Sequence, residues 1–266
     1  MDNLGDISTI LTKGKIVEQI NLNNNHHKIK IEAPQIVQKA IPGQFVMLSK
    51  WKIKELFLKR PFSFYNIEPD LGTFDILYKN VGKGTQILTE SKTGDLIELI
   101  GPLGNGFETP ESVYNIAIVA RGIGIAPLMP LMLESKQKGI KIYSFLSAQT
   151  ENLLLYSDKI ESISKKTFYT TDDGSKGAKG KVTNFLEKVL EETAIDVVYT
   201  CGSKRLVQHI KKLQKKYNFL AFVSLEEHMA CGIGACKGCV HKTVNGFKRV
   251  CKEGPVFPVE EVIFND

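Results

Sequence analysis

The sequence predicts a multi-domain chain of the α/β plus β class, with three parts in series. Short alternating strands dominate the N-terminal part, strands alternate with helix-length segments in the middle, and glycine and cysteine dominate the end. At 266 residues and 29.7 kDa the chain has room for one or two domains and a small appendage. The changes in pattern place the boundaries of the three parts at residues 1–110, 111–223 and 224–266.

The N-terminal part is predicted to be a barrel or a sandwich. Short runs alternate apolar and polar side chains, and turn residues such as Pro42-Gly43 and Gly101-Pro102 separate them. Many short strands at this spacing are typical of closed or stacked antiparallel sheets. The expected strands are Gln44–Leu48, His27–Glu32, Thr73–Lys79 and Asp95–Ile100.

The middle part is predicted to be a parallel sheet with covering helices. Ile116–Ala120 is a continuous apolar run, and a glycine turn and a helical stretch from Ile125 to Lys138 follow it. Strands that alternate with helices in this way indicate parallel α/β topology. The remaining expected elements are strands at Ile142–Leu146, Asp196–Thr200 and Phe219–Val223 and helices at Val182–Glu192 and Arg205–Tyr217.

Composition excludes several classes of protein. Hydrophobic residues make up 42% of the chain and charged residues 24%, which excludes a mainly disordered or collagen-like chain. A net charge of +6 spread over this length does not indicate a nucleic-acid partner. The most apolar stretch, Asn115–Leu133, is broken by Arg121 and two prolines, and residues 1–8 lack the features of a signal peptide. We therefore expect a cytoplasmic protein with no membrane partner.

The cysteines give the most specific signal. Cys231, Cys236 and Cys239 follow a C-x4-C-x2-C spacing, and Cys251 comes after eleven more residues. This spacing is that of plant-type [2Fe–2S] ferredoxins, in which four thiolates hold two irons. Interspersed glycines permit the backbone to wrap a cluster and to point N–H groups at its sulfurs. The four cysteines are therefore predicted to hold a [2Fe–2S] cluster.

Structural zinc is the rival interpretation of the same residues. Zinc sites usually take two separated C-x2-C pairs, and only Cys236 and Cys239 form such a pair here. A zinc-stabilised, non-enzymatic binding module therefore stays open as a distant alternative. Cys201 lies at a predicted strand end, far from the others, and is interpreted as a buried small residue and not as a ligand.

A second group of motifs points to a flavin. Arg60-Pro61-Phe62-Ser63 offers a guanidinium for a pyrophosphate and a hydroxyl for a flavin or ribitol, although a surface arginine beside a proline is the plain alternative. Leu77-Tyr78-Lys79 follows it. Gly82-Lys83-Gly84-Thr85 then opens a predicted helix, where backbone N–H groups favour phosphate.

Together these motifs resemble one family. From about Thr12 to Phe257 the chain is similar to the electron-transfer subunit of class B dihydroorotate dehydrogenase, within the ferredoxin reductase superfamily. The resemblance rests on the two flavin motifs, on Gly101–Phe107, on Gly122–Pro127, on Asp172–Ser175 with Gly180, and on the tail from Ser224 to Phe257.

The resemblance implies an FAD-binding antiparallel β-barrel, a ferredoxin-reductase-like nicotinamide-binding α/β domain and a small C-terminal [2Fe–2S] domain. It implies electron transfer from NAD(P)H through FAD to the cluster, with no catalytic residue of the chain's own. The cluster ligands carried over are the same four cysteines. The positions carried over for cofactor binding are Arg60, Pro61, Phe62, Ser63, Leu77, Tyr78, Lys79, Gly84 and Thr85 for FAD, and Gly122 and Gly124 in the nicotinamide loop.

The resemblance also implies a partner. An FMN-containing catalytic subunit like dihydroorotate dehydrogenase, joined in a heterotetramer, would make this oxidoreductase component part of pyrimidine biosynthesis. Two rivals share the architecture: the small subunit of a bifurcating NADH-dependent ferredoxin:NADP transhydrogenase, and a self-sufficient reductase for a diffusible acceptor.

Three departures from the family pattern fall in the middle part. Arg121 stands where the nicotinamide loop usually has a glycine, Gln149 where an arginine is expected and Ser203 where a proline is expected. An arginine adds bulk where a dinucleotide must approach the backbone closely. We therefore expect changed or weakened nicotinamide binding. Outside the motifs, His26 and His27 are expected on an exposed turn.

Overall fold

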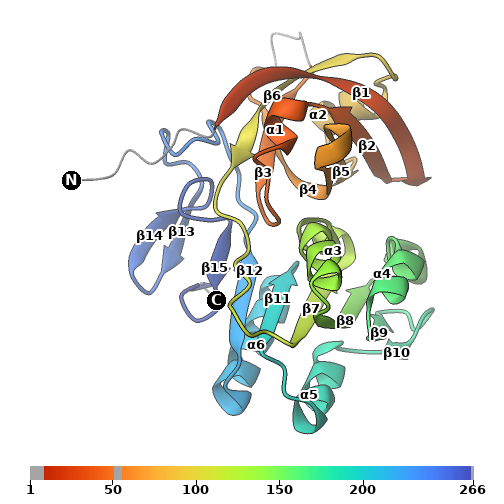
Figure 1. The fold of residues 1–266 in the computed structure, drawn as a ribbon, viewed down its shortest axis with the longest axis vertical. Helices are drawn as coiled ribbons and strands as arrows, with labels where there is room; N and C mark the ends of the chain where they lie inside the picture. The colour runs from red at the N-terminus through yellow and green to blue at the C-terminus, as the bar shows by residue number, and fades with distance from the viewer. Residues whose placement is uncertain (1–8, 51–55, 265–266) are drawn as a thin grey trace.

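The structure is a computed structural model that describes residues 9–50 and 56–264. The absence of a signal peptide was predicted from residues 1–8, which lie outside the described residues. Two bodies make up most of the chain, a barrel and an open sheet, and the C-terminal segment runs along both (Figure 1).

The N-terminal body is a closed antiparallel barrel, so the barrel prediction is confirmed and the sandwich is not. Its strands join in the order β1-β2-β5-β4-β3-β6. Alternate residues such as Ile29, Ile31, Phe74 and Ile76 fill the interior. The strands are β1 (Ile10–Asn23), β2 (His26–Glu32), β3 (Phe45–Ser49), β4 (Arg60–Glu68), β5 (Thr73–Lys79) and β6 (Leu96–Leu103).

The longest barrel strand, β1, was not predicted. Its outward positions mix the apolar Leu11 with Lys13 and Lys15, and its inward pattern is interrupted by Gly14. A Cβ at Gly14 would lie 2.7 Å from side-chain atoms of both Ile31 and Leu99. The glycine therefore lets β1 lie close to inward side chains of both neighbouring strands, β2 and β6. Because it has no side chain, it also interrupts the alternation of apolar and polar residues by which a strand is predicted.

The second body is the expected parallel sheet. Its order is β10-β9-β8-β7-β11-β12-β15, so the chain moves outward from β7 to β9 and then returns to the other side of β7. This reversal between β7 and β11 is a topological switch point, where ligands bind at the carboxyl ends of strands. The parallel strands are β7 (Asn115–Arg121), β8 (Lys141–Ala148), β9 (Lys166–Thr171), β10 (Ala178–Lys179), β11 (Val197–Cys201) and β12 (Leu220–Ser224).

Helices cover both faces of the sheet. On the face toward the barrel lie the 3-10 turn η2 (Gly122–Leu128), α3 (Met129–Gln137) and α4 (Ser157–Ile163), and on the other face lie α5 (Thr183–Glu192) and α6 (Lys204–Tyr217) (Figure 1). Alternate residues of β7 serve the two faces: Ile116 and Ile118 pack with the first group, and Ala117 and Val119 with the second. Three short helical segments complete the set: α1 (Pro34–Val37), η1 (Pro69–Leu71) and η3 (Glu151–Leu153).

The C-terminal segment contains regular structure that the sequence did not reveal. A hairpin of β13 (Val240–Thr243) and β14 (Gly246–Arg249) precedes β15 (Val256–Pro258), which pairs antiparallel with β12. The segment therefore adds an edge strand to the α/β sheet (Figure 1). The division into residues 1–110, 111–223 and 224–266 stays a prediction, and β15 of the third part completes the sheet of the second.

One core joins all three parts. Phe45 and Met47 of the barrel, Val198 of the sheet, and Cys239 and Cys251 of the C-terminal segment belong to the same buried cluster. No helix of the described residues is long and apolar enough to cross a membrane.

Candidate functional site

A cavity of about 710 Å³ opens between the barrel and the sheet. Its walls come from β4, β5 and α2 (Lys83–Thr89) of the barrel, from η2 of the sheet and from the segment after β12. All nine residues carried over for FAD line it: Arg60, Pro61, Phe62, Ser63, Leu77, Tyr78, Lys79, Gly84 and Thr85. Positions scattered over β4, β5 and α2 therefore meet at one space of a size suited to a large ligand.

An aromatic wall forms one side of this cavity. Tyr78 is buried, with its ring stacked on His27 at 5.4 Å and edge-on to Phe62 at 5.9 Å. Burial raises the pKa of Tyr78 to about 12, so it stays a neutral phenol. The prediction that His26 and His27 lie on an exposed turn is wrong: both begin β2 and are buried, and desolvation lowers the pKa of each.

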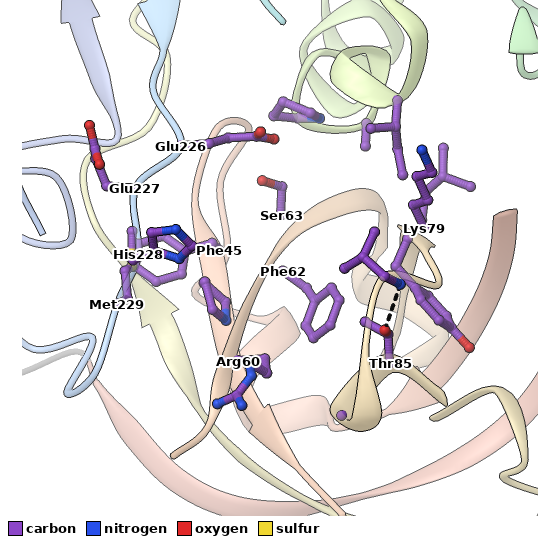
Figure 2. Close-up of a pocket in the computed structure, with 18 of the residues that line it drawn as sticks. Phe45, Arg60, Phe62, Ser63, Lys79, Thr85, Glu226, Glu227, His228 and Met229 are labelled. Carbon is purple, nitrogen blue, oxygen red and sulfur yellow. Dashed lines mark hydrogen bonds between the residues drawn. The ribbon is translucent and has the colours of Figure 1, made fainter. Parts of the chain in front are cut away.

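The two ends of the cavity differ in charge. Figure 2 shows Arg60 and Thr85 at one end and Glu226 and Ser63 at the other. Lys79 and Lys83 also line the cavity, and Figure 2 shows Lys79 well apart from Arg60. This polarity suits a ligand with an anionic tail near Arg60 and a polar ring system near Ser63.

The hydroxyl of Thr85 stabilises the start of α2. Its hydroxyl accepts hydrogen bonds from the backbone N–H groups of Val81, at 2.9 Å, and Gly82, at 3.1 Å. These donors at the start of α2 are thus already paired within the loop. The glycine loop shapes the cavity wall, and its expected role in holding a phosphate stays a prediction.

The acidic end was missed by the sequence analysis. Glu226, Glu227, His228 and Met229 all line the cavity. Burial raises the pKa of Glu226, and its charge contributes to the raised pKa of the fully buried Cys201 thiol, whose main cause is desolvation. The missed signal was the run between Ser224 and Cys231, in which acids stand between a buried strand and the first cluster cysteine.

The four predicted cluster ligands come together in the structure. Each of their sulfurs accepts a backbone N–H: Cys251 from Gly234 at 3.1 Å, Cys231 from Cys236, Cys236 from Gly238 and Cys239 from Cys251, the last three at 3.4 Å. All four cysteines are unbridged. Donors aimed at every sulfur favour thiolate, so the residues present fit an iron–sulfur cluster.

The sulfurs approach one another in two pairs. The thiols of Cys231 and Cys236 lie within hydrogen-bonding reach, as do those of Cys239 and Cys251. Among the described residues, no group of three or more cysteine, histidine or carboxylate side chains is arranged to hold a single metal ion. Two thiol pairs suit a cluster with two irons better than one tetrahedral zinc. Cys201 lies apart at the end of β11, as expected of a non-ligand.

The cluster loop packs directly on the barrel strand that borders the cavity. A Cβ at Gly232, whose φ is +71°, would lie 2.4 Å from Met47 of β3. Phe45, two residues earlier on β3, lines the cavity. The cysteine loop and the cavity therefore meet on β3, at positions two residues apart.

The nicotinamide loop occupies the switch point of the sheet. A Cβ at Gly124 would lie 2.6 Å from the carbonyl oxygen of Cys201, so only glycine fits between η2 and the end of β11. Gly122 has a φ of +53° and open space around its Cα. Neither glycine lines the cavity itself, but Ile123 and Ala126 of the same turn do.

The three departures from the family pattern lie at this edge. Arg121 ends β7 and donates two hydrogen bonds to Asp172, at 2.7 and 3.2 Å, across 51 positions of sequence. Ser203 accepts a hydrogen bond from the N–H of Leu206 at 3.3 Å and thereby caps α6. Gln149 is exposed, and its carbonyl accepts the N–H of Asp173.

Comparison with protein-family models divides the chain in the same order. Residues 13–107 match the oxidoreductase FAD-binding domain, residues 118–212 the oxidoreductase NAD-binding domain, and residues 226–263 the iron-sulfur cluster binding domain of dihydroorotate dehydrogenase B. The chain is thus built of domains for FAD, a nicotinamide nucleotide and an iron–sulfur cluster.

Curated relatives match nearly end to end. The dihydroorotate dehydrogenase B (NAD(+)) electron transfer subunit of Caldanaerobacter subterraneus subsp. tengcongensis is 43% identical over 231 residues, 85% of this chain and 89% of the relative. The subunit of the same name from Clostridium acetobutylicum is 38% identical over 255 residues, 96% of this chain and 98% of the relative.

A solved structure has a similar fold. It belongs to an NADH-dependent reduced ferredoxin-NADP oxidoreductase studied for flavin-based electron bifurcation. The TM-score is 0.85 at 31% sequence identity, covering 94% of this chain and 89% of that one. A ferredoxin NADP+ reductase from Neisseria gonorrhoeae, at 19% identity and a TM-score of 0.65, shares the fold over 78% of this chain.

Proposed function

The chain belongs to the family of dihydroorotate dehydrogenase B electron transfer subunits, and from that premise we propose that it carries electrons between NAD(P)H and a separate FMN-containing catalytic subunit. The route runs through FAD in the cavity and a [2Fe–2S] cluster on the four cysteines. The observation that carries the proposal is the shared strand β3, with Phe45 on the cavity and Met47 against the cysteine loop.

The protein supplies binding and position for this chemistry. A bound flavin would supply the conversion of a two-electron donor into single-electron steps, which suits a one-electron cluster. Phe62 and Tyr78 form an aromatic wall that His27 supports from behind, and Arg60 places a positive charge at the end opposite Ser63. The described residues of the cavity thus bind and orient a cofactor.

The exposed edge of the cysteine loop supports a partner subunit there. Cys239 and Cys251 are buried, whereas Cys236 is exposed. Large apolar side chains stand exposed on the same segment, among them Ile233 and Phe247. An electron can leave where the cluster approaches the surface, and apolar groups around that point suit a protein contact. The proposed assembly is a heterotetramer of two such chains and two catalytic subunits.

The nucleotide edge is proposed to bind NAD(P)H weakly. Arg121 and Asp172 already satisfy each other across the carboxyl ends of the sheet. A dinucleotide that uses this edge must displace at least part of that pair. Gly122 and Gly124 remain the proposed contacts for its phosphates, outside the flavin cavity.

An anaerobic absorbance titration tests the proposal. Purified protein that contains both chromophores receives NADH, then NADPH, and dithionite serves as the chemical control. Bleaching of both flavin and cluster bands at stoichiometric NADH supports donor input through this chain and contradicts weak binding. Bleaching only at large excess supports both statements. Bleaching by dithionite alone refutes NAD(P)H as the donor.

A second candidate function follows from the solved structure. The fold similarity to a bifurcating NADH-dependent oxidoreductase, at a TM-score of 0.85, suits the small subunit of such a complex equally well. Co-purification of the native complex separates the two. An FMN-containing partner that oxidises dihydroorotate supports the first candidate, and a partner that reduces NADP+ with ferredoxin supports the second.

A further inference from the structure

Arg249, at the end of β14, makes an unusual number of contacts for a half-exposed side chain. Its guanidinium forms a two-pronged ion pair with Glu253, through Nε at 3.0 and 3.1 Å and through a short contact from a second nitrogen. The remaining terminal nitrogen, Nη1, donates to the carbonyl oxygen of Gly234 at 2.8 Å. One residue thus clamps the C-terminal turn to the cysteine loop.

The same arginine organises the turn that presents Cys251. Its carbonyl oxygen accepts N–H groups from Lys252, Glu253 and Gly254, at 3.1, 2.9 and 3.4 Å. Its own N–H donates to the carboxylate of Glu253 at 2.7 Å. Backbone and side chain therefore both fix Arg249 relative to Cys251.

The contact with Gly234 bears directly on a cluster sulfur. The N–H of Gly234 donates to Sγ of Cys251 at 3.1 Å, the shortest of the four N–H···S contacts. The carbonyl of this residue is the group that Arg249 holds. Gly234 has a φ of +81°, a backbone conformation that glycine adopts readily. Its contacts with Arg249 and Cys251 hold the peptide in this orientation.

Charge adds to position. The Arg249 guanidinium lies one residue away from a ligand sulfur, because its Nη1 binds the carbonyl oxygen of the same Gly234 whose N–H donates to Sγ of Cys251. A fixed positive charge near the sulfurs stabilises the reduced cluster, which carries one more electron, and an N–H···S hydrogen bond acts in the same direction.

We propose that Arg249 is a positioning residue that raises the reduction potential of the cluster, by its charge and by holding the Gly234 peptide against Cys251, and that Glu253 moderates this charge. The proposal rests on the proposed function only in requiring the cluster. It predicts opposite effects for the two members of the ion pair, because each substitution leaves the other charge uncompensated.

The test is a redox titration of the cluster-loaded full chain, followed by electron paramagnetic resonance. Arg249→Gln removes both the positive charge and the guanidinium contacts with Glu253 and Gly234. Arg249→Lys keeps the charge and loses this contact geometry. Glu253→Gln leaves the arginine charge without its carboxylate partner. Lys242→Gln is the matched control, since it removes an exposed charge on the same hairpin. The flavin potential of each variant is an internal reference.

Arg249→Gln is expected to make the cluster about threefold to tenfold harder to reduce, where tenfold corresponds to about 59 mV for one electron. Arg249→Lys should show a smaller loss, and Glu253→Gln should make reduction easier. Lys242→Gln should leave the potential unchanged, because an exposed charge is screened by solvent and salt. Equal shifts in Arg249→Gln and Lys242→Gln would overturn the proposal.

If Arg249→Gln does not retain its cluster, the other two variants decide. Shifts of opposite sign in Arg249→Lys and Glu253→Gln support the proposal, and no shift in either overturns it. Dithionite is the reductant in this titration, so reduction of the cluster needs neither NADH nor a partner subunit. A failure of NADH reduction would therefore count against the proposed function and leave this inference standing.

Discussion

Two regions of the molecule differ in how closely they follow the family motifs. The first is the flavin cavity with the neighbouring cysteine loop, and the second is the nucleotide edge of the sheet. In the first region, the nine residues carried over for FAD line one cavity and the four cysteines lie in two contacting pairs, and their binding roles stay predictions. In the second, Arg121, Gln149 and Ser203 replace expected residues, and Arg121 and Ser203 have found new partners. The two regions share η2, whose Ile123 and Ala126 line the cavity.

The difference shows that the two kinds of site tolerate substitution to different degrees. The cysteine loop depends on backbone N–H groups and on glycines without room for a Cβ, such as Gly232 against Met47. Such a site tolerates little change. At the nucleotide edge, Gly124 is confined in the same way, but the neighbouring Arg121 turns outward to Asp172. That edge can accept a new side chain and still fold, so its binding can change while the fold persists.

The largest effect is expected from a cluster ligand, which would break the first region alone. Cys239→Ser should abolish the iron–sulfur absorbance and paramagnetic signal and keep the flavin band, because a serine oxygen is a poor substitute for a buried thiolate. Iron and sulfide analysis measures the loss. Cys201→Ser is the matched control, equally buried but outside the ligand set, and it should retain iron. Equal loss of iron in both would contradict the assignment.

A moderate effect is expected at the nucleotide edge. Arg121→Gly should tighten NADH binding by up to about fivefold, since a half-exposed ion pair contributes at most about 1 kcal/mol. Isothermal titration calorimetry on the flavin-loaded protein gives the dissociation constant. Asp172→Asn breaks the same pair and keeps the arginine bulk, so it separates the two causes. Weaker NADH binding in Arg121→Gly would show instead that the arginine holds the nucleotide.

The smallest effect is expected from pH, at a buried carboxyl of β5, the strand whose end lines the cavity. Asp75 of β5 is buried, 3.9 Å from Lys28, with Oδ1 unpaired among the described residues, and burial raises its pKa. A carboxyl with a raised folded-state pKa stabilises the fold while protonated and loses that contribution as pH rises through this pKa. Asp75→Asn should therefore raise the melting temperature at pH 8, on the order of a degree or two.

The comparison of pH 8 with pH 4 gives the sign. The gain in Asp75→Asn should shrink as the pH falls through the raised pKa of Asp75, because the wild-type carboxyl takes up its proton there. Asp95 is the control of opposite sign, because its hydrogen bond with Lys50 lowers its pKa. Asp95→Asn should lower the melting temperature at pH 8, and this loss should fade as the pH falls. Parallel behaviour of the two variants would contradict the pKa directions.

Sequence by itself determined the features that depend on short-range spacing. The order of the three parts followed from changes in local pattern along the chain. The cysteine spacing and the motif at Arg60–Ser63 are short segments, and few ligands suit such spacings of thiols or of a guanidinium and a hydroxyl. The strands β2, β3 and β5 followed from short runs bounded by turn residues, and β7 followed from a continuous apolar run that is buried on both faces. β1 did not, since Gly14 interrupts its inward face.

Only the tertiary structure decided which distant residues meet. Arg121 reaches Asp172 because parallel strands end at the same edge, and Glu226 shares the cavity with Ser63 because the chain enters the cavity wall just after β12 (Figure 2). β15 joins the α/β sheet, and Arg249 meets Gly234. Local pattern carries no record of such pairings, which follow from the packing of the barrel, the sheet and the cysteine loop around a shared core.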